Sequence, residues 1–134
     1  MALNRRKERE IVYQMLFASQ FYPEDETAAV FEIMIEQMEE GAKESEYIKR
    51  TFFGTRAYAE KAMEKIESAA RDWKLDRLSK GTLSVLQLVL YEMECAEDVP
   101  VKIAINEAVE LAKKFSSDEA PSFINGVLGK AAQG

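Results

Sequence analysis

Four cationic side chains near the start of the chain could together bind a polyanion. They are Arg5, Arg6, Lys7 and Arg9, within the run NRRKER, whereas the whole chain of 134 residues has a net charge of −6. Positive charge in the first turn of a helix opposes the helix dipole, and like charges at i, i+4 repel each other. Helix stability alone would therefore favour acidic residues here, so the cations indicate a binding site. The alternative is an ordinary solvated start of a helix.

Aromatic residues continue the same helical face. Arg9, Tyr13 and Phe17 follow one another at i, i+4 and i+8, with Arg6 beside them, while the apolar residues within 11–16 occupy the neighbouring face. We therefore expect an exposed strip of cations and aromatic rings. Such a strip suits single-stranded RNA, whose phosphates are neutralised by arginine and whose bases stack on rings. Packing of Tyr13 and Phe17 at the edge of the core is the alternative.

The residues needed for several kinds of catalysis and metal binding are missing. The chain has no histidine, and Cys95 is its only cysteine. This excludes an internal disulfide, zinc sites of the Cys/His type and catalysis that depends on histidine. There is no phosphate-binding glycine motif, and the carboxylates are dispersed. We expect no catalytic residue, no metal and no cofactor, and therefore not an enzyme.

Two further features concern location and charge. No apolar run approaches the ~18 residues that span a bilayer, and no signal peptide is visible, so a cytoplasmic protein without membrane contact is expected. Residues 24–46 contain nine acidic residues and one lysine, Lys43. A basic protein partner could meet this segment, which leaves open the alternative of a pure protein–protein scaffold.

Helical periodicity runs through the whole chain and predicts one all-α domain of about seven helices. Asn4 and Ser79 suit N-caps, whereas Gly41 and Gly54 suit helix ends. The segment 80–95 is apolar on more than one face, so we expect it at the centre. Two sub-bundles are expected within the single domain 1–134, at about 1–75 and 76–134. The helices are expected at about 4–21, 27–40, 44–54, 56–73, 80–95, 100–115 and 119–132.

Several long segments resemble one known family. They are VPVKIAINEAVELAKKFSSDEAPSFINGVLGKAA (99–132), LYEM (90–93), WKLDRLS (73–79) and RRKEREIVYQMLFASQF (5–21). Together they resemble the NusB family of bacterial transcription antitermination factors, from end to end and most weakly over 22–56. The resemblance implies an all-helical fold of two roughly perpendicular bundles.

The resemblance also implies a function in binding. It implies binding of boxA RNA together with NusE, a small-subunit ribosomal protein. Through other Nus factors and RNA polymerase, the complex promotes read-through of ribosomal RNA operons. The RNA-binding residues implied or expected are Arg5, Arg6, Lys7, Arg9, Tyr13, Asp118, Glu119 and Phe123, and those facing the protein partner are Phe17, Gln20 and Thr82.

Some of these assignments have alternatives. Phe123 could belong to the core, and Asp118 could be a helix cap. Gln87 stands where many relatives have arginine, and Thr82 where some have an acidic residue, so family contacts from these two positions are in doubt. The same helical module also occurs in certain ribosomal RNA cytosine methyltransferases, so an accessory module of an RNA-modifying enzyme is a further alternative. The family includes monomers and dimers, and the sequence does not decide between them.

Overall fold

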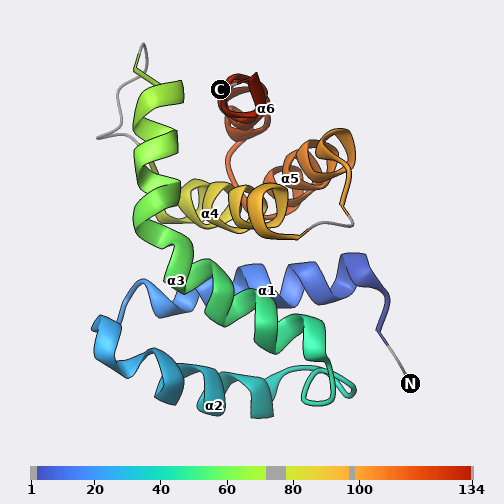
Figure 1. Cartoon of the computed structure of the whole chain (residues 1–134). Helices are drawn as coiled ribbons and strands as arrows, with labels where there is room; N and C mark the ends of the chain where they lie inside the picture. The colour runs from blue at the N-terminus through green and yellow to red at the C-terminus, as the bar shows by residue number, and fades with distance from the viewer. Residues whose placement is uncertain (1–2, 72–77, 97–98, 134) are drawn as a thin grey trace.

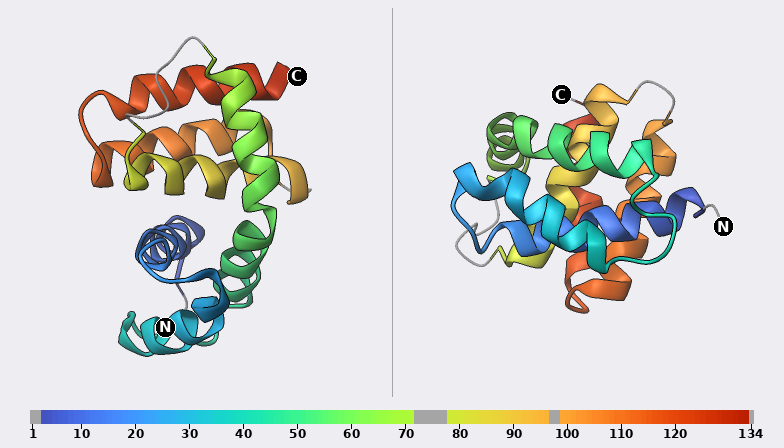
Figure 2. Two further views of the ribbon diagram at one scale, coloured as in Figure 1. Left: turned by 90° about the vertical axis from the view of Figure 1, so that its left-hand side faces the viewer. Right: turned by 90° about the horizontal axis from the view of Figure 1, so that it is seen from below.

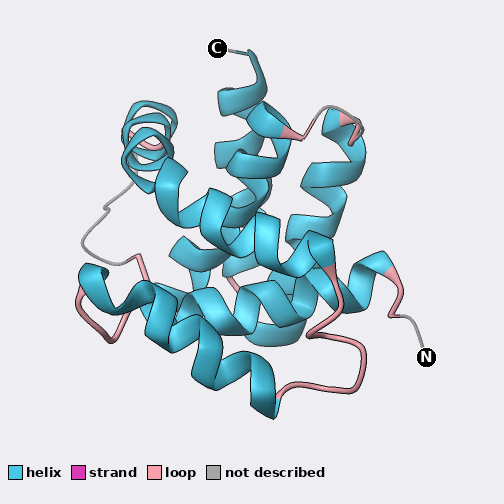
Figure 3. Cartoon of the chain, turned by 60° about the horizontal axis from the view of Figure 1, so that its bottom comes forward, coloured by secondary structure: helices cyan, strands magenta, loops and turns pink. Residues whose placement is uncertain are grey.

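The computed structural model describes residues 3–71, 78–96 and 99–133, and within them every regular element is helical (Figure 3). The expected end of one helix at residue 73 and the junction between the expected sub-bundles lie outside these residues. Six α-helices and one short 3₁₀ helix are present where about seven helices were expected. They are α1 (Arg5–Ser19), η1 (Glu24–Glu26), α2 (Thr27–Gln37), α3 (Glu46–Ala69), α4 (Lys80–Cys95), α5 (Val101–Phe115) and α6 (Ala120–Gln133).

Side-chain caps explain where three of the helices begin. The Asn4 side chain accepts a hydrogen bond from the Lys7 backbone N–H at 2.8 Å, and Ser79 accepts one from the Thr82 N–H at 3.1 Å. Both caps were predicted. Ser45 caps α3 in the same way. The prediction for Gly41 was wrong, because α2 ends at Gln37 and Gly41, with φ of 98°, lies in the following turn. Glycine adopts this left-handed conformation without steric cost.

Helix α3 continues through Gly54, where the sequence predicted a helix end. A Cβ at Gly54 would lie 2.4 Å from the Cζ of Tyr91, so the missing side chain lets the Tyr91 ring of α4 lie against the α3 backbone. Gly54 therefore serves a close approach between two helices. The two helices expected at 44–54 and 56–73 are one helix of 24 residues, Glu46–Ala69.

The helices form two groups that cross steeply, with α3 shared between them. Figure 1 shows α3 passing from the group that contains α1 and α2 to the group that contains α4, α5 and α6. It packs against α1, α4 and α6. In the left view of Figure 2, α1 is seen end-on while α5 and α6 run across the page. This agrees with the expectation of two roughly perpendicular bundles.

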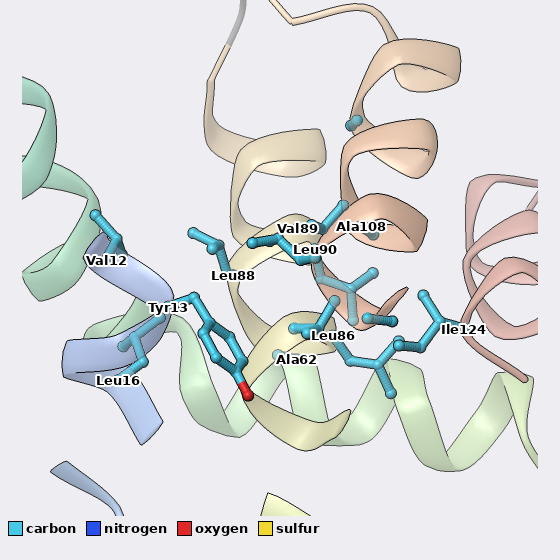
Figure 4. Packing of buried hydrophobic residues seen from close by; sticks show 14 of the residues in the cluster. Val12, Tyr13, Leu16, Ala62, Leu86, Leu88, Val89, Leu90, Ala108 and Ile124 are labelled. Carbon is cyan, nitrogen blue, oxygen red and sulfur yellow. The ribbon is translucent and has the colours of Figure 1, made fainter. Parts of the chain in front are cut away.

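Helix α4 lies at the centre of the core, as its apolar sequence predicted. Figure 4 shows α4 between Val12 and Leu16 of α1 on one side and Ala108 of α5 and Ile124 of α6 on the other. Side chains on all faces of α4 are buried, including Val85, Leu86, Leu88, Val89 and Leu90. Burial of such side chains is the main source of stability in a domain of this size. Among the described helices, none has both the length and the apolar character needed to cross a membrane.

Candidate nucleic-acid interface

The cations at the start of α1 divide into an exposed set and a buried arginine. The side chains of Arg5, Arg6 and Lys7 are 52%, 61% and 40% exposed. Arg9 is only 5% exposed, so the prediction that it lies on an exposed strip was wrong. Arg9 shares the face of Arg5 but lies one turn further along, where residues of α4 and α5 cover it.

Arg9 is held by two buried carboxylates. Its Nε and Nη2 donate to the two carboxylate oxygens of Glu92 at 2.8 and 3.0 Å, and its Nη1 donates to Oε1 of Glu107 at 3.0 Å. The Tyr47 hydroxyl donates to Oε1 of Glu92 at 3.0 Å. We call these four residues the Arg9 cluster. They come from α1, α3, α4 and α5, so the cluster fixes the start of α1 against three other helices.

The pKa values of Arg9 and Tyr47 depend on their burial and on the charges around them. Burial lowers the pKa of Arg9, but the hydrogen bond with Glu92 and the nearby negative charges outweigh it, so the pKa is raised. Burial, together with the charge of Glu92, also raises the pKa of Tyr47. Both shifts favour a charged Arg9 and a neutral Tyr47 phenol, the forms that their hydrogen bonds with Glu92 require.

Each exposed cation of α1 has an acidic neighbour, which for Arg5 is Glu8, at 3.4 Å. Arg6 donates through Nη2 to Oε2 of Glu107 at 2.6 Å. The Arg5 guanidinium lies 3.9 Å from the centre of the Tyr47 ring. Lys7 lies 3.2 Å from Glu39. The exposed pair of Lys7 and Glu39 stabilises the fold little, and Glu107 keeps its hydrogen bond from Arg9 when Arg6 turns away, so a phosphate could replace either carboxylate at small cost.

A polar cavity of about 280 Å³ lies between α1 and α5, beside the exposed cations. Its lining includes Arg6 and Glu107 together with Lys113 and Lys114 from the last turn of α5. Lys114 reaches across to Oε1 of Glu10 at 2.8 Å. The two lysines therefore add positive charge to the same face. Sequence reasoning missed them, although the KK pair was visible, because only the fold brings the end of α5 beside α1.

The aromatic residues of α1 differ in their exposure. Tyr13 is 4% exposed, and its ring lies 4.9 Å from that of Phe115, so its expected place on an exposed strip was also wrong. Phe17 is 37% exposed and contacts Phe21, with 5.3 Å between the ring centres. Phe21 and Tyr22 are 60% and 53% exposed. The exposed aromatic surface is thus at the end of α1, far from the cations at its start.

The expected protein-facing residues lie where α1 meets the start of α4. The Gln20 side chain donates to the carbonyl of Lys80 at 2.8 Å and also to the Ser84 hydroxyl. Phe17 lies one turn before Gln20 and is partly exposed. Thr82 is buried, and its hydroxyl bonds to Ser79 at 3.0 Å and Ser116 at 3.1 Å. A surface therefore exists at Phe17 and Gln20, whereas the Thr82 side chain faces inward.

The remaining expected RNA contacts lie beyond the other end of α5. Helix α5 crosses α1, and its first half meets the start of α1 through Glu107 and Arg6, while its end meets the middle of α1 through Phe115 and Tyr13. Asp118 and Glu119 follow α5 and are exposed, and Phe123 of α6 is half-buried against the core. These three residues are therefore near the Tyr13 end of the face and not beside Arg6. Gln87, whose family contacts were in doubt, is buried in α4.

No cluster of three or more possible metal ligands occurs in the described part of the chain. The features that remain are the cationic face of α1 and α5 and the aromatic surface at the end of α1. Both suit binding of macromolecules.

Comparison with known proteins identifies the family. The model of the NusB family matches residues 6–133. Transcription antitermination protein NusB of Clostridium botulinum (strain Kyoto / Type A2) is 39% identical over 141 residues, covering 96% of this chain and 99% of that protein. The protein of the same name from Clostridium novyi (strain NT) is 40% identical, covering 95% and 96%. The structure of T. maritima NusB superposes with a TM-score of 0.85 at 29% identity, covering 99% of this chain and 93% of that one. The chain belongs to the NusB family.

Proposed function

We propose that this protein is a transcription antitermination factor that binds single-stranded RNA of the boxA type together with the ribosomal protein NusE. The relatives named transcription antitermination protein NusB support this role. The observation that carries it is the set of exposed cations at the start of α1, Arg5, Arg6 and Lys7, with Lys113 and Lys114 of α5 lining the cavity beside Arg6, on a chain that is acidic overall. A basic patch of this size suits a short polyanion.

In this proposal, the RNA phosphates replace surface carboxylates as partners of the exposed cations. Arg6 exchanges Glu107 for a phosphate, and Lys7 exchanges Glu39. Arg9 keeps its own carboxylates and acts as a positioning residue that holds α1 in place. Tyr13 supports the same face from within the core. Asp118, Glu119 and Phe123 are further proposed contacts, toward the other end of the bound strand.

The proposed protein surface lies at the end of α1. Phe17 and Gln20 adjoin the first turn of α4, and Phe21 and Tyr22 enlarge the exposed aromatic area. NusE would bury these rings, which protein interfaces favour. Other Nus factors and RNA polymerase would then join through the complex, in the cytoplasm. The proposed role is binding and not catalysis, and no observation favours an accessory module of an RNA-modifying enzyme.

The small number of cations sets the expected strength of RNA binding. If three phosphates contact Arg5, Arg6 and Lys7, log K should fall with log[salt] at a slope of roughly −2, from ~0.7 per contact with a single strand. Binding by the protein alone should therefore be modest and sensitive to salt. A partner that contacts the same RNA raises the overall affinity through effective concentration.

The decisive experiment is a titration of boxA RNA and of a scrambled RNA, with and without NusE. The test variant replaces Arg5, Arg6 and Lys7 with alanine. The control variant replaces Lys43, Lys61 and Arg71 with alanine. These three cations are exposed and lie outside the proposed RNA-binding face, so the control removes the same amount of charge.

We expect the wild type and the control variant to prefer boxA RNA, the test variant to bind it weakly, and NusE to tighten binding. Equal binding of both RNAs by all three proteins would overturn the proposed RNA recognition. Failure of NusE to tighten binding would overturn the proposed joint complex.

A further inference from the structure

A second cavity opens on the opposite side of Arg5 from the cationic face. Its volume is about 420 Å³, and it lies between the first half of α3 and the end of α4. The lining includes Arg5, Tyr47, Arg50, Tyr91 and Cys95. The volume falls within the ~300–1,000 Å³ of typical small-ligand sites. None of these residues apart from Arg5 was implicated in RNA binding by the sequence.

The lining alternates cations with aromatic rings. The Arg5 guanidinium lies 3.9 Å from the centre of the Tyr47 ring. One turn further along α3, Arg50 is exposed and forms no ion pair with any described residue. Tyr91 of α4 is the second aromatic residue of the lining. Its ring meets that of Tyr58 edge-on, with 6.4 Å between the ring centres. Interleaved arginines and flat rings are the pattern that binds single-stranded nucleic acid.

Among the described residues, the lining of the cavity holds two arginines, Arg5 and Arg50, and one carboxylate. Glu92 is the acidic residue in its lining, and both of its carboxylate oxygens are bonded to the Arg9 guanidinium at 2.8 and 3.0 Å. Its charge is therefore compensated from within the core. Arg50 has no carboxylate partner among the described residues, so an anion in the cavity could bind its guanidinium.

The glycine at position 54 shapes this cavity. Since a Cβ there would lie 2.4 Å from the Cζ of Tyr91, a residue other than glycine would push the ring away from α3. The ring is thus held by both helices and needs no ordering when a ligand binds. A ring held in this way stacks on a base with little loss of conformational entropy.

We propose that this cavity binds the next nucleotide of the same single-stranded RNA, with Arg50 on its phosphate and Tyr91 against its base. The inference rests on the proposed function and extends it. Arg5 belongs both to the cation run of α1 and to the lining of this cavity, so an RNA strand that passes Arg5 reaches the cavity directly. The strand then turns around the start of α1 and continues onto α3.

Cys95 gives a direct test, because it lines the cavity, is exposed and is the only cysteine of the chain. The rate of its alkylation by N-ethylmaleimide would be measured by mass spectrometry on the whole wild-type protein, with and without boxA RNA. At an RNA concentration of ten times Kd, the rate should fall roughly tenfold, because only unbound protein reacts. The scrambled RNA at the same concentration should protect much less.

Two charge-reversal variants on α3 provide a second test of the proposal. Arg50→Glu should weaken binding of boxA RNA by about tenfold or more, from loss of a charged hydrogen bond, and should reduce the protection of Cys95. Lys49→Glu makes the same change one residue away, at an exposed position outside the cavity lining, and should have a much smaller effect. Both side chains are exposed, so circular dichroism should show both variants folded.

The outcomes separate the two proposals. If boxA RNA binds but leaves Cys95 fully reactive, and Arg50→Glu behaves like Lys49→Glu, the cavity is not an RNA site and the proposed function still stands. If the wild type does not bind boxA RNA in preference to scrambled RNA, the proposed function fails and this inference fails with it.

Discussion

Arg6 and Arg9 lie on adjacent sides of one helical turn, and both bind Glu107, yet their surroundings differ completely. Arg6 is largely exposed and has this single carboxylate partner, whereas Arg9 is buried and binds Glu92 with two hydrogen bonds as well. A cationic run in a sequence can therefore contain both buried arginines and exposed arginines. Burial decides which arginine stabilises the fold and which one is free to exchange partners.

Variants of Arg6 and Arg9 should differ most in the stability of the folded protein. Arg9→Ala leaves Glu92 buried without its partner and should lower the free energy of unfolding by about 3–5 kcal/mol. Arg6→Ala leaves Glu107 with Arg9 as its remaining partner, so it should lower the urea midpoint much less than Arg9→Ala does. Urea unfolding followed by circular dichroism measures both. An Arg9→Ala protein as stable as Arg6→Ala would contradict the structural role of the Arg9 cluster.

A smaller loss is expected from the Tyr47 hydroxyl. Tyr47→Phe removes the hydrogen bond to Glu92 and keeps the ring beneath Arg5, so the free energy of unfolding should fall by about 1.5–3 kcal/mol. Tyr22→Phe, at an exposed position, is the matched control. If both variants unfold at the same urea concentration, the hydroxyl of Tyr47 does not contribute to the cluster.

The dependence of stability on pH should come in part from Glu107. Its hydrogen bond from Arg6 lowers the pKa below the ordinary value of 4.5, although burial opposes this. The stabilisation is therefore fully present above pH 4.5 and is lost as the pH falls through the lower pKa of the folded protein. Glu107→Gln should flatten this acid loss in urea titrations at a series of pH values. Glu64→Gln, an exposed carboxylate on α3, should follow the wild type.

The smallest effect is on the salt dependence of RNA binding. Arg6→Ala should reduce the slope of log K against log[salt] by about 0.7, the share of one phosphate contact. Arg9→Lys keeps a buried charge but loses the two-pronged geometry, so it should lower stability and leave the slope unchanged. Fluorescence anisotropy at several salt concentrations measures the slope. A changed slope for Arg9→Lys and not for Arg6→Ala would reverse the assignment of the two arginines.

Local sequence signals predicted much of the fold. The helical class, the caps at Asn4 and Ser79 and the central place of α4 follow from side-chain periodicity and from hydrogen bonds between residues three apart. The predicted helix end at Gly54 was wrong because a glycine that ends a helix and a glycine that makes room for a neighbouring ring look alike in sequence. Only the position of Tyr91 distinguishes them.

The candidate site was less predictable, for a physical reason. The cations were found by their spacing, but the burial of Arg9 depends on Glu92 and Glu107, which lie 83 and 98 residues away in the chain. A helical wheel shows which residues share a face and cannot show which face a later helix covers. The same limit explains why Lys113 and Lys114, and Arg50 of the second cavity, were not found.

The passage of α3 through both groups of helices has a consequence for how the protein unfolds. Helix α3 packs against α1 in one group and against α4 and α6 in the other. If either group opened alone, half of this helix would lose its apolar partners, and a helix segment of that length is barely stable in water. The two groups should therefore unfold as one cooperative unit, with the slowest amide hydrogen exchange along the middle of α3.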